Sequence, residues 1–171
     1  MMSKFSRSLS IAVISLLATG AFAQESSNRV AANTDWSVFV ENSPKECWSV
    51  SKPKKTVNSK NGQVVQVRRG DILMFVSYRP GSSGEVSFTG GYPFKPDSTV
   101  SLTIGSDTYQ LFVDGEWAWS KPDDDAKIIA AMKKGASAVL VGMSGRGTRT
   151  EDTFSLLGFT AAVDDAAARC K

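Results

Sequence analysis

Short apolar segments separated by turn residues are the feature that most constrains the fold of this 171-residue chain. From Trp36 onward, segments such as 72–76, 85–89 and 99–104 are strand-length and bounded by Gly, Pro, Asn or Asp. Strands that recur about every 8 to 12 residues are typical of antiparallel sandwiches and barrels. We therefore predict a mostly β chain that forms one antiparallel β-sandwich or barrel-like domain over residues 36–171.

Two short helices are expected to interrupt this pattern. Residues 123–134 begin with acids, contain apolar residues at helical spacing and end with two lysines, an order that the helix dipole favours. Thr160 is placed to cap a second helix over residues 160–170. The sequence contains no internal repeat that would indicate a second domain.

Two turn sequences predict hairpins. Asn61-Gly62 is a strong two-residue hairpin signal. Arg69-Gly70-Asp71 lies between the apolar segments 64–67 and 72–76, so it also predicts a tight turn. The same tripeptide is the integrin-recognition sequence, and adhesion is the alternative interpretation. Its position between two expected strands favours the simple turn.

The first residues have the pattern of an export signal. Lys4 and Arg7 precede an apolar stretch at 9–18, and a small-x-small pattern follows. We predict a signal peptide over residues 1–23 with cleavage before Gln24. The apolar stretch is only about half of the roughly 20 residues that a spanning helix needs, so the mature chain is expected to lack a transmembrane segment.

Removal of this signal would leave residues 24–171. Residues 24–35 are polar and lack periodicity, and we expect them to form a flexible lead-in. Because Lys4 and Arg7 are lost with the signal, the formal charge falls from +3 to +1. The mature protein is then almost neutral.

Cys47 and Cys170 are the two cysteines of the chain, and both remain after processing. In an oxidising compartment two cysteines of a small domain usually pair. A redox pair is the alternative, but there is no C-x-x-C and no His to lower a thiol pKa. We predict a structural disulfide that closes most of the domain.

The chain has no histidine, which excludes Ser-His-Asp and Cys-His catalysis and the commonest zinc ligand. The spacing of Ser51 and Lys54 matches S-x-x-K, but Pro53 lies inside the motif and its partner motifs are absent. Asp123 to Asp125 lack the calcium-loop pattern. We expect no catalytic, cofactor-binding or metal-binding residues, and keep a Ser-Lys hydrolase as the alternative.

A local excess of basic residues is the strongest electrostatic feature. Charge alone favours a solvated hairpin, but the excess also fits a surface for an anionic partner. Nucleic acid is not expected, since the compartment is wrong and no aromatic residues interleave the run. The candidate partner-binding cations are Lys45, Lys52, Lys54, Lys55, Lys60, Arg68 and Arg69.

The four tryptophans divide into two pairs. Trp36 and Trp48 are expected in the core beside Cys47. Trp117 and Trp119 are two residues apart, so on a strand they share one face. A core face is the default for this pair. An exposed aromatic pair beside Tyr109 is the alternative, and it would add both tryptophans to the candidate partner-binding residues.

Several segments resemble the invasion-associated locus B family of bacterial exported proteins. They are Asp35-Trp36-Ser37-Val38, Glu46-Cys47-Trp48, Ser77-Tyr78-Arg79-Pro80-Gly81 and the ending Phe154 to Ala162. The resemblance covers roughly Trp36 to Cys170. It implies a small, mostly β protein of the Gram-negative periplasm or cell surface, with no established catalytic residues or cofactor. Some members are linked to host-cell entry.

From these observations we expect a non-enzymatic envelope protein that is periplasmic, secreted or surface-associated. Its expected partner is an envelope or host-surface protein or an anionic glycolipid. The alternatives are the Ser-Lys hydrolase and a structural or stress-protective protein without a discrete ligand.

Overall fold

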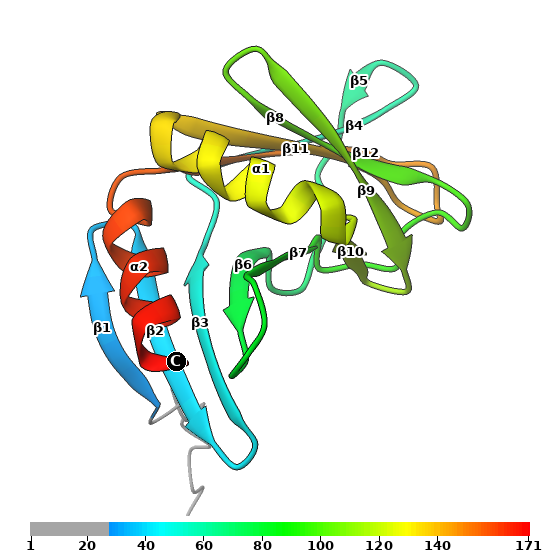
Figure 1. Ribbon diagram of the computed structural model, residues 1–171. Coiled ribbons are helices and arrows are strands. Elements are labelled where there is room, and N and C mark those ends of the chain that lie inside the picture. Colours follow the sequence, from blue (N-terminus) through cyan, green and yellow to red (C-terminus); the bar gives the residue numbers. More distant parts are fainter. Residues whose placement is uncertain (1–27) are drawn as a thin grey trace, which may run out of the picture.

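The computed structural model describes residues 28–171, so the signal peptide expected at 1–23 lies outside the described residues. The described strands form one antiparallel sheet in the order β1-β2-β3-β6-β7-β10-β9-β8-β11-β12-β4-β5 (Figure 1). This confirms the expected mostly β, antiparallel single domain. The strands are β1 (Arg29–Asn33), β2 (Trp36–Asn42), β3 (Lys45–Ser51), β4 (Lys55–Lys60), β5 (Gln63–Val64), β6 (Leu73–Tyr78), β7 (Glu85–Thr89), β8 (Thr99–Ile104), β9 (Asp107–Asp114), β10 (Trp117–Trp119), β11 (Ser137–Met143) and β12 (Arg149–Ser155).

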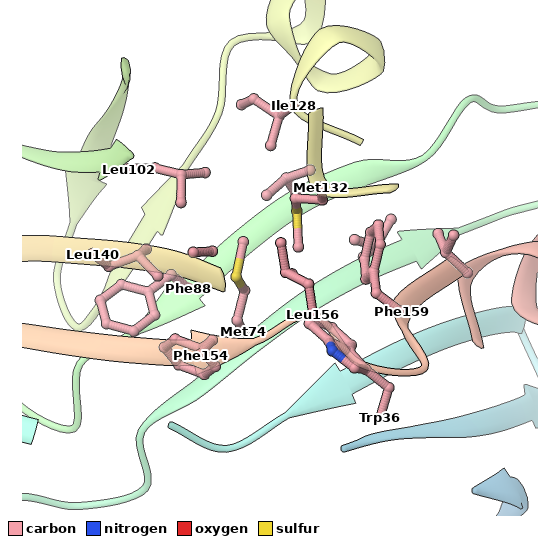
Figure 2. Close-up of a cluster of buried hydrophobic side chains, with 14 of the residues drawn as sticks. Trp36, Met74, Phe88, Leu102, Ile128, Met132, Leu140, Phe154, Leu156 and Phe159 are labelled. Carbon is pink, nitrogen blue, oxygen red and sulfur yellow. The ribbon is translucent and has the colours of Figure 1, made fainter. Parts of the chain in front are cut away.

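The sheet curls so that distant strands share one core. Phe88 on β7 and Phe154 on β12 are separated by four strands in the sheet order, yet their ring centroids are 6.1 Å apart and the rings meet edge to face. Figure 2 shows Leu140 beside these rings and Met74 close to Phe154. The inner face of the sheet therefore supplies one continuous hydrophobic core, as alternation along each strand requires.

Both helices contribute to this core. The helices are α1 (Pro122–Lys134), which contacts β7 and β9, and α2 (Phe159–Arg169), which lies over β2 and β3 (Figure 1). Ile128 and Met132 of α1 and Val163 of α2 are fully buried or nearly so. Neither helix is long and apolar enough to cross a membrane within the described chain.

The first helix begins one residue before the expected Asp123, at Pro122, and has the expected three acids in its first turn. Asp125 does more than complement the dipole. Its buried carboxylate accepts hydrogen bonds from the Val86 amide and the Ser120 hydroxyl. Burial raises the pKa of Asp125, and these two hydrogen bonds oppose the rise. This carboxylate attaches the start of α1 to β7.

The second helix begins one residue before the expected Thr160 cap, at Phe159, and Gly158 occupies the cap position. Gly158 has φ +86°, and a Cβ there would lie 1.9 Å from the Asn33 carbonyl oxygen. Only glycine fits this close approach. The neighbouring Trp36 indole donates a hydrogen bond to the Ser155 carbonyl at 2.9 Å. The ring centroids of Trp36 and Phe159 are 4.8 Å apart (Figure 2).

The disulfide prediction is confirmed. Cys47 on β3 and Cys170 after α2 are bonded, with Cα atoms 5.8 Å apart and a sequence separation of 123. Both residues are buried. The bond fixes the last helix to the third strand.

One of the two predicted hairpins is confirmed. Asn61 and Gly62 join β4 to β5 with φ values of +52° and +78°. The turn expected at Arg69-Gly70-Asp71 is wrong. Beyond Val64 the chain leaves the sheet until Leu73, and β6 pairs with β3 and β7 rather than with β5.

The expected lead-in at residues 24–35 contains a strand. Residues 29–33 form β1, which pairs antiparallel with β2 and has a bulge between Arg29 and Ala31. Within β1, Arg29, Val30 and Ala32 are exposed at the edge of the sheet, and Ala31 packs against the core. Edge strands often lack an apolar pattern.

Candidate functional site

The outer face of the sheet carries a row of aromatic side chains on β2, β3, β6 and β10, which we call the aromatic face. The rings of Phe39 and Trp48 stack with centroids 5.6 Å apart. The ring centroids of Phe75 and Trp117 are also 5.6 Å apart, and so are those of Trp117 and Trp119. Ladder register places Phe75 diagonally from Trp48 across β3 and β6, so the row is continuous.

Strand alternation explains why these rings point outward. Cys47 faces the core and is fully buried, so the next residue, Trp48, must face the opposite side. In the same way Met74 and Val76 are fully buried and flank Phe75. Because the inner residues of these strands pack in the core, the aromatic residues that alternate with them lie on the outer face.

The tryptophan predictions have mixed outcomes. Trp36 is 1% exposed, as expected for a core residue. The core position expected for Trp48 is wrong, since it lies half-buried on the outer face. Trp117 and Trp119 share one face, as expected, and this is the exposed alternative rather than the core face, because Trp117 is 38% exposed.

The expected neighbour of this tryptophan pair is also corrected. Tyr109 packs against the core cluster on the other side of β9. Phe112, 48% exposed, instead lies opposite Trp119 in the β9–β10 ladder. Phe112 thus extends the exposed aromatic surface toward β8.

Two depressions follow the aromatic face. The first, which we call the lysine groove, has a volume of about 540 Å³. The residues that line it include Phe39, Trp48 and Phe75 together with Lys52 and Lys54. The structure therefore brings two of the predicted cations beside aromatic residues that the sequence did not associate with them.

The second depression, which we call the tryptophan groove, has a volume of about 230 Å³. It is lined by Trp117 and Trp119 and bordered by Arg79. Trp48 and Phe75 line both grooves. The two grooves are therefore neighbouring parts of one surface.

Charged groups differ between the two ends of this surface. In the lysine groove, Lys54 Nζ is 2.5 Å from Asp35 Oδ1, and its hydrogen bond is the main cause of a lowered Asp35 pKa. Lys52 is exposed and has no ion pair among residues 28–171. At the other end, Arg79 contacts Glu46 at 2.7 Å and Glu85 at 3.5 Å. Arg29 lines the lysine groove as well and also has no ion pair among residues 28–171, so the unpaired cations lie at the Lys52 end, where the Asp71 carboxylate also lines the groove.

The remaining predicted lysines do not join this surface. Lys45 begins β3 and lines a different depression, which Arg169 also lines. Lys55 and Lys60 lie at the two ends of β4, close to the opposite edge of the sheet order. The basic run is thus contiguous in sequence but divided in space.

Arg69 is not a surface cation. Its guanidinium makes two hydrogen bonds to the Asp152 carboxylate, at 2.8 and 2.6 Å, and its side chain is 6% exposed. It also donates to the Gly90 carbonyl at 2.8 Å and lies 5.1 Å from the Tyr92 ring centroid. Burial raises the pKa of Asp152, and Arg69 opposes this rise. Such burial removes Arg69 from any integrin contact, whereas the adjacent Arg68 is exposed.

The geometry of Ser51 and Lys54 differs from that of a Ser-Lys catalytic pair. The Ser51 hydroxyl is almost buried and donates to the Asp35 carbonyl at 2.6 Å. Lys54 is occupied by the Asp35 carboxylate. A base must reach the proton of the nucleophile, and within the described chain no hydrogen bond joins these two side chains.

Among the described residues, no cluster of three or more His, Cys, Asp or Glu side chains could hold a metal ion. Of the three aspartates at 123–125, Asp125 is used inside the fold as described above. Asp124 pairs with Lys127 at 2.9 Å.

Sequence reasoning missed Phe39, Phe75 and the outward position of Trp48. A signal for Trp48 was present, because adjacent residues of a strand face opposite sides and Cys47 was expected in the core. Phe39 and Phe75 carried no such signal. Their strands are short apolar runs, and such a run does not reveal which alternate residues are inside.

Comparisons with known proteins identify the family. The family model described as "Invasion associated locus B (IalB) protein" matches residues 36–167. The crystal structure of invasion associated protein b from Bartonella henselae is similar, with a TM-score of 0.56 and 17% identity over 80% of this chain and 94% of that one. At this identity the likeness concerns the fold. No curated protein sequence matched. Since the family model covers most of the described domain, the chain belongs to the invasion associated locus B family.

Proposed function

We propose that this protein is an exported, non-enzymatic envelope protein that binds a partner protein through the aromatic face. The observation that carries the proposal is the row of partly exposed rings spanning four strands, from Phe39 to Trp119. Aromatic residues are enriched at the centres of protein interfaces, and contiguous apolar surface on a folded domain often marks one.

Export is supported by two independent features. The N-terminal sequence has the charge, apolar stretch and small-residue site of a signal peptide. The Cys47–Cys170 bond is consistent with an oxidising compartment such as the periplasm. Together they favour a location in the envelope or at the cell surface.

The charge pattern indicates the chemistry of the partner. Lys52 is exposed at the end of the lysine groove, while the Arg79 charge at the other end is balanced by two glutamates. A partner with an apolar centre and a carboxylate opposite Lys52 would complement this surface. The names of the family and of the Bartonella henselae protein extend the candidates to host-surface proteins.

A binding role fits the described residues better than hydrolysis. The Ser51 hydroxyl is directed to a backbone carbonyl, and Lys54 is held by Asp35. Neither group is arranged to attack a substrate. A structural role without a discrete partner would leave the exposed row of rings without an explanation.

The experiment is in-cell crosslinking followed by pull-down of the exported protein and two variants. The first variant combines Trp117→Ser with Lys52→Glu, which removes one ring and reverses one of the unpaired charges. The matched control combines Val64→Ser with Lys60→Glu, since both residues are exposed on the β4–β5 hairpin. We expect a discrete partner band that the first variant loses and the control retains.

Thermal unfolding of both variants separates a binding defect from a folding defect. Retention of the partner by a folded Trp117→Ser/Lys52→Glu variant would show that the aromatic face is not the binding surface. Binding of the protein to vesicles containing an anionic glycolipid, in place of a protein band, would replace the protein partner with a lipid. An empty pull-down for every version would favour a structural role.

A further inference from the structure

A separate cavity of about 610 Å³ lies away from the aromatic face and shares no lining residue with either of its grooves. It lies where four segments meet. These are the stretch before β6, the turn after β7, the β9–β10 turn and the loop between β11 and β12. Its size is within the range of about 300–1,000 Å³ found for small-molecule sites.

The wall of this cavity is fixed by a buried ion pair. Arg69 lines the cavity, and Asp152 holds its guanidinium from behind through two hydrogen bonds. Arg69 in turn lies against the ring of Tyr92, whose hydroxyl is 2.5 Å from that of Thr150. A buried ion pair gives little net stability, because desolvation offsets its attraction. Its clearest effect here is to hold Tyr92 and Thr150 in place.

Backbone hydrogen bonds join the segments around the cavity. The Gly70 amide donates to the Gly91 carbonyl at 2.8 Å, and the Gly145 amide donates to the Pro93 carbonyl at 3.1 Å. At Gly91, φ is +72° and a Cβ would lie 2.6 Å from the Gly70 carbonyl oxygen. The sequence therefore keeps this approach free of side chains, and the cavity is formed before any ligand enters.

The charge of the cavity is positive. Arg69 is neutralised by Asp152, but Arg68 and Arg146 are exposed and have no ion pair within residues 28–171. Among the described residues, Glu116 is the one carboxylate that lines the cavity. Two arginines that are not neutralised can bind a carboxylate through paired hydrogen bonds, which is the geometry that guanidinium groups favour.

We propose that this cavity binds an acidic sugar, with its carboxylate at Arg68 and Arg146 and its ring against Tyr92 and Pro93. The cavity is too large for a bare anion, and its walls combine apolar surface with hydroxyl groups. Glu116 is placed to accept hydrogen bonds from sugar hydroxyls. This inference does not depend on the aromatic face or on a protein partner.

The test is a titration of the exported protein, followed by backbone-amide NMR, with three probes. Glucuronate carries both the carboxylate and the ring, glucose carries the ring alone, and acetate carries the carboxylate alone. We expect saturable shifts at the amides of Gly145 and Arg146 with glucuronate. Affinity for glucose should be weaker by roughly tenfold or more, because glucose lacks the hydrogen bonds to a charged group. Affinity for acetate should also be weaker, because acetate lacks the ring contacts and the hydroxyl hydrogen bonds.

Variants locate the site. Arg68→Gln with Arg146→Gln should weaken glucuronate binding by roughly tenfold or more, because the charged hydrogen bonds are lost. The single variant Arg146→Gln, which changes a residue of an exposed loop, should show part of this loss of glucuronate affinity. Arg149→Gln is the matched control, since Arg149 is exposed beside the cavity but pairs with Glu151. It should leave binding unchanged.

Three results would overturn the proposal. One is the absence of saturable shifts with glucuronate. Another is binding of acetate as tight as that of glucuronate, which would reduce the cavity to a simple anion site. The third is unchanged binding in the folded Arg68→Gln/Arg146→Gln variant, which would place the sugar elsewhere.

Discussion

Aromatic residues lie on both faces of the sheet at β2, β3 and β6, but they have different roles on the two faces. On the inner face, Trp36 and Phe159 pack edge to face at the start of α2, and the Cys47–Cys170 bond ties the other end of this helix to β3. On the outer face, Trp48 stacks on Phe39, and neither of the two helices in residues 28–171 covers this pair. Aromatic residues of one region thus belong either to the core or to an exposed surface, and strand parity decides which. The inner set should govern stability and the outer set should govern binding.

The largest effect is expected on the inner face, from loss of the disulfide. Replacement of both Cys47 and Cys170 by Ala should lower the free energy of unfolding by about 4–5 kcal/mol, because the bond closes a long loop. Denaturant unfolding of the oxidised protein and the variant measures the difference. A loss below about 1 kcal/mol would show that α2 is held by packing alone.

The next effect is expected at Trp36. Trp36→Ala should lower the free energy of unfolding by about 3–5 kcal/mol, as for other large core truncations. The variant also loses the hydrogen bond to the Ser155 carbonyl. Chemical denaturation followed by circular dichroism gives the value. The partner pull-down of this variant should be unchanged below its unfolding temperature.

Trp48 is the matched outer residue. Trp48→Ala should cost only about 1 kcal/mol, since it removes one stacked pair and little buried area. The same variant should lose the crosslinked partner. A loss of stability as large as that of Trp36→Ala would show that the outer residue contributes to stability as much as the inner one, which contradicts the proposed division of roles.

The smallest expected effect is a decrease in the free energy of unfolding at alkaline pH. Burial raises the pKa of Tyr78 to about 12, with a further contribution from the Asp164 charge on α2. Because the folded pKa is above the unfolded value of about 10, stability from this group is complete below pH 10 and is lost as pH rises toward 12. Unfolding of the protein and of Tyr78→Phe over this range should show a smaller decline in the variant.

The fold was predictable where signals were local. The Asn61-Gly62 turn, both helices and the disulfide were all expected from neighbouring residues or from the compartment, and the structure has them. The error at Arg69-Gly70-Asp71 has a different cause. A turn tripeptide gives no information about a carboxylate 83 positions away, and it is Asp152 that draws Arg69 inward.

The candidate surfaces were less predictable for the same reason. Lys52 and Lys54 were expected to act with other nearby cations, but their neighbours in space are Phe39 and Phe75. The arginine-lined cavity joins segments from four separate parts of the chain. Strand order, which is set by long-range pairing, determines such juxtapositions, and no short pattern encodes it.

The position of α2 also has a consequence for the order in which the protein can be completed. Strands β1 to β3 are among the first described segments to be synthesised, yet the helix that covers their inner face follows all the other described elements. Gly158 must reach the Asn33 carbonyl, and Cys170 must reach Cys47, before this end of the core is closed. A chain that emerges vectorially from a ribosome or a translocation channel therefore exposes Trp36 and Val38 to water until residues 159–170 arrive. During that interval the apolar inner face of the early strands is open to association with other chains.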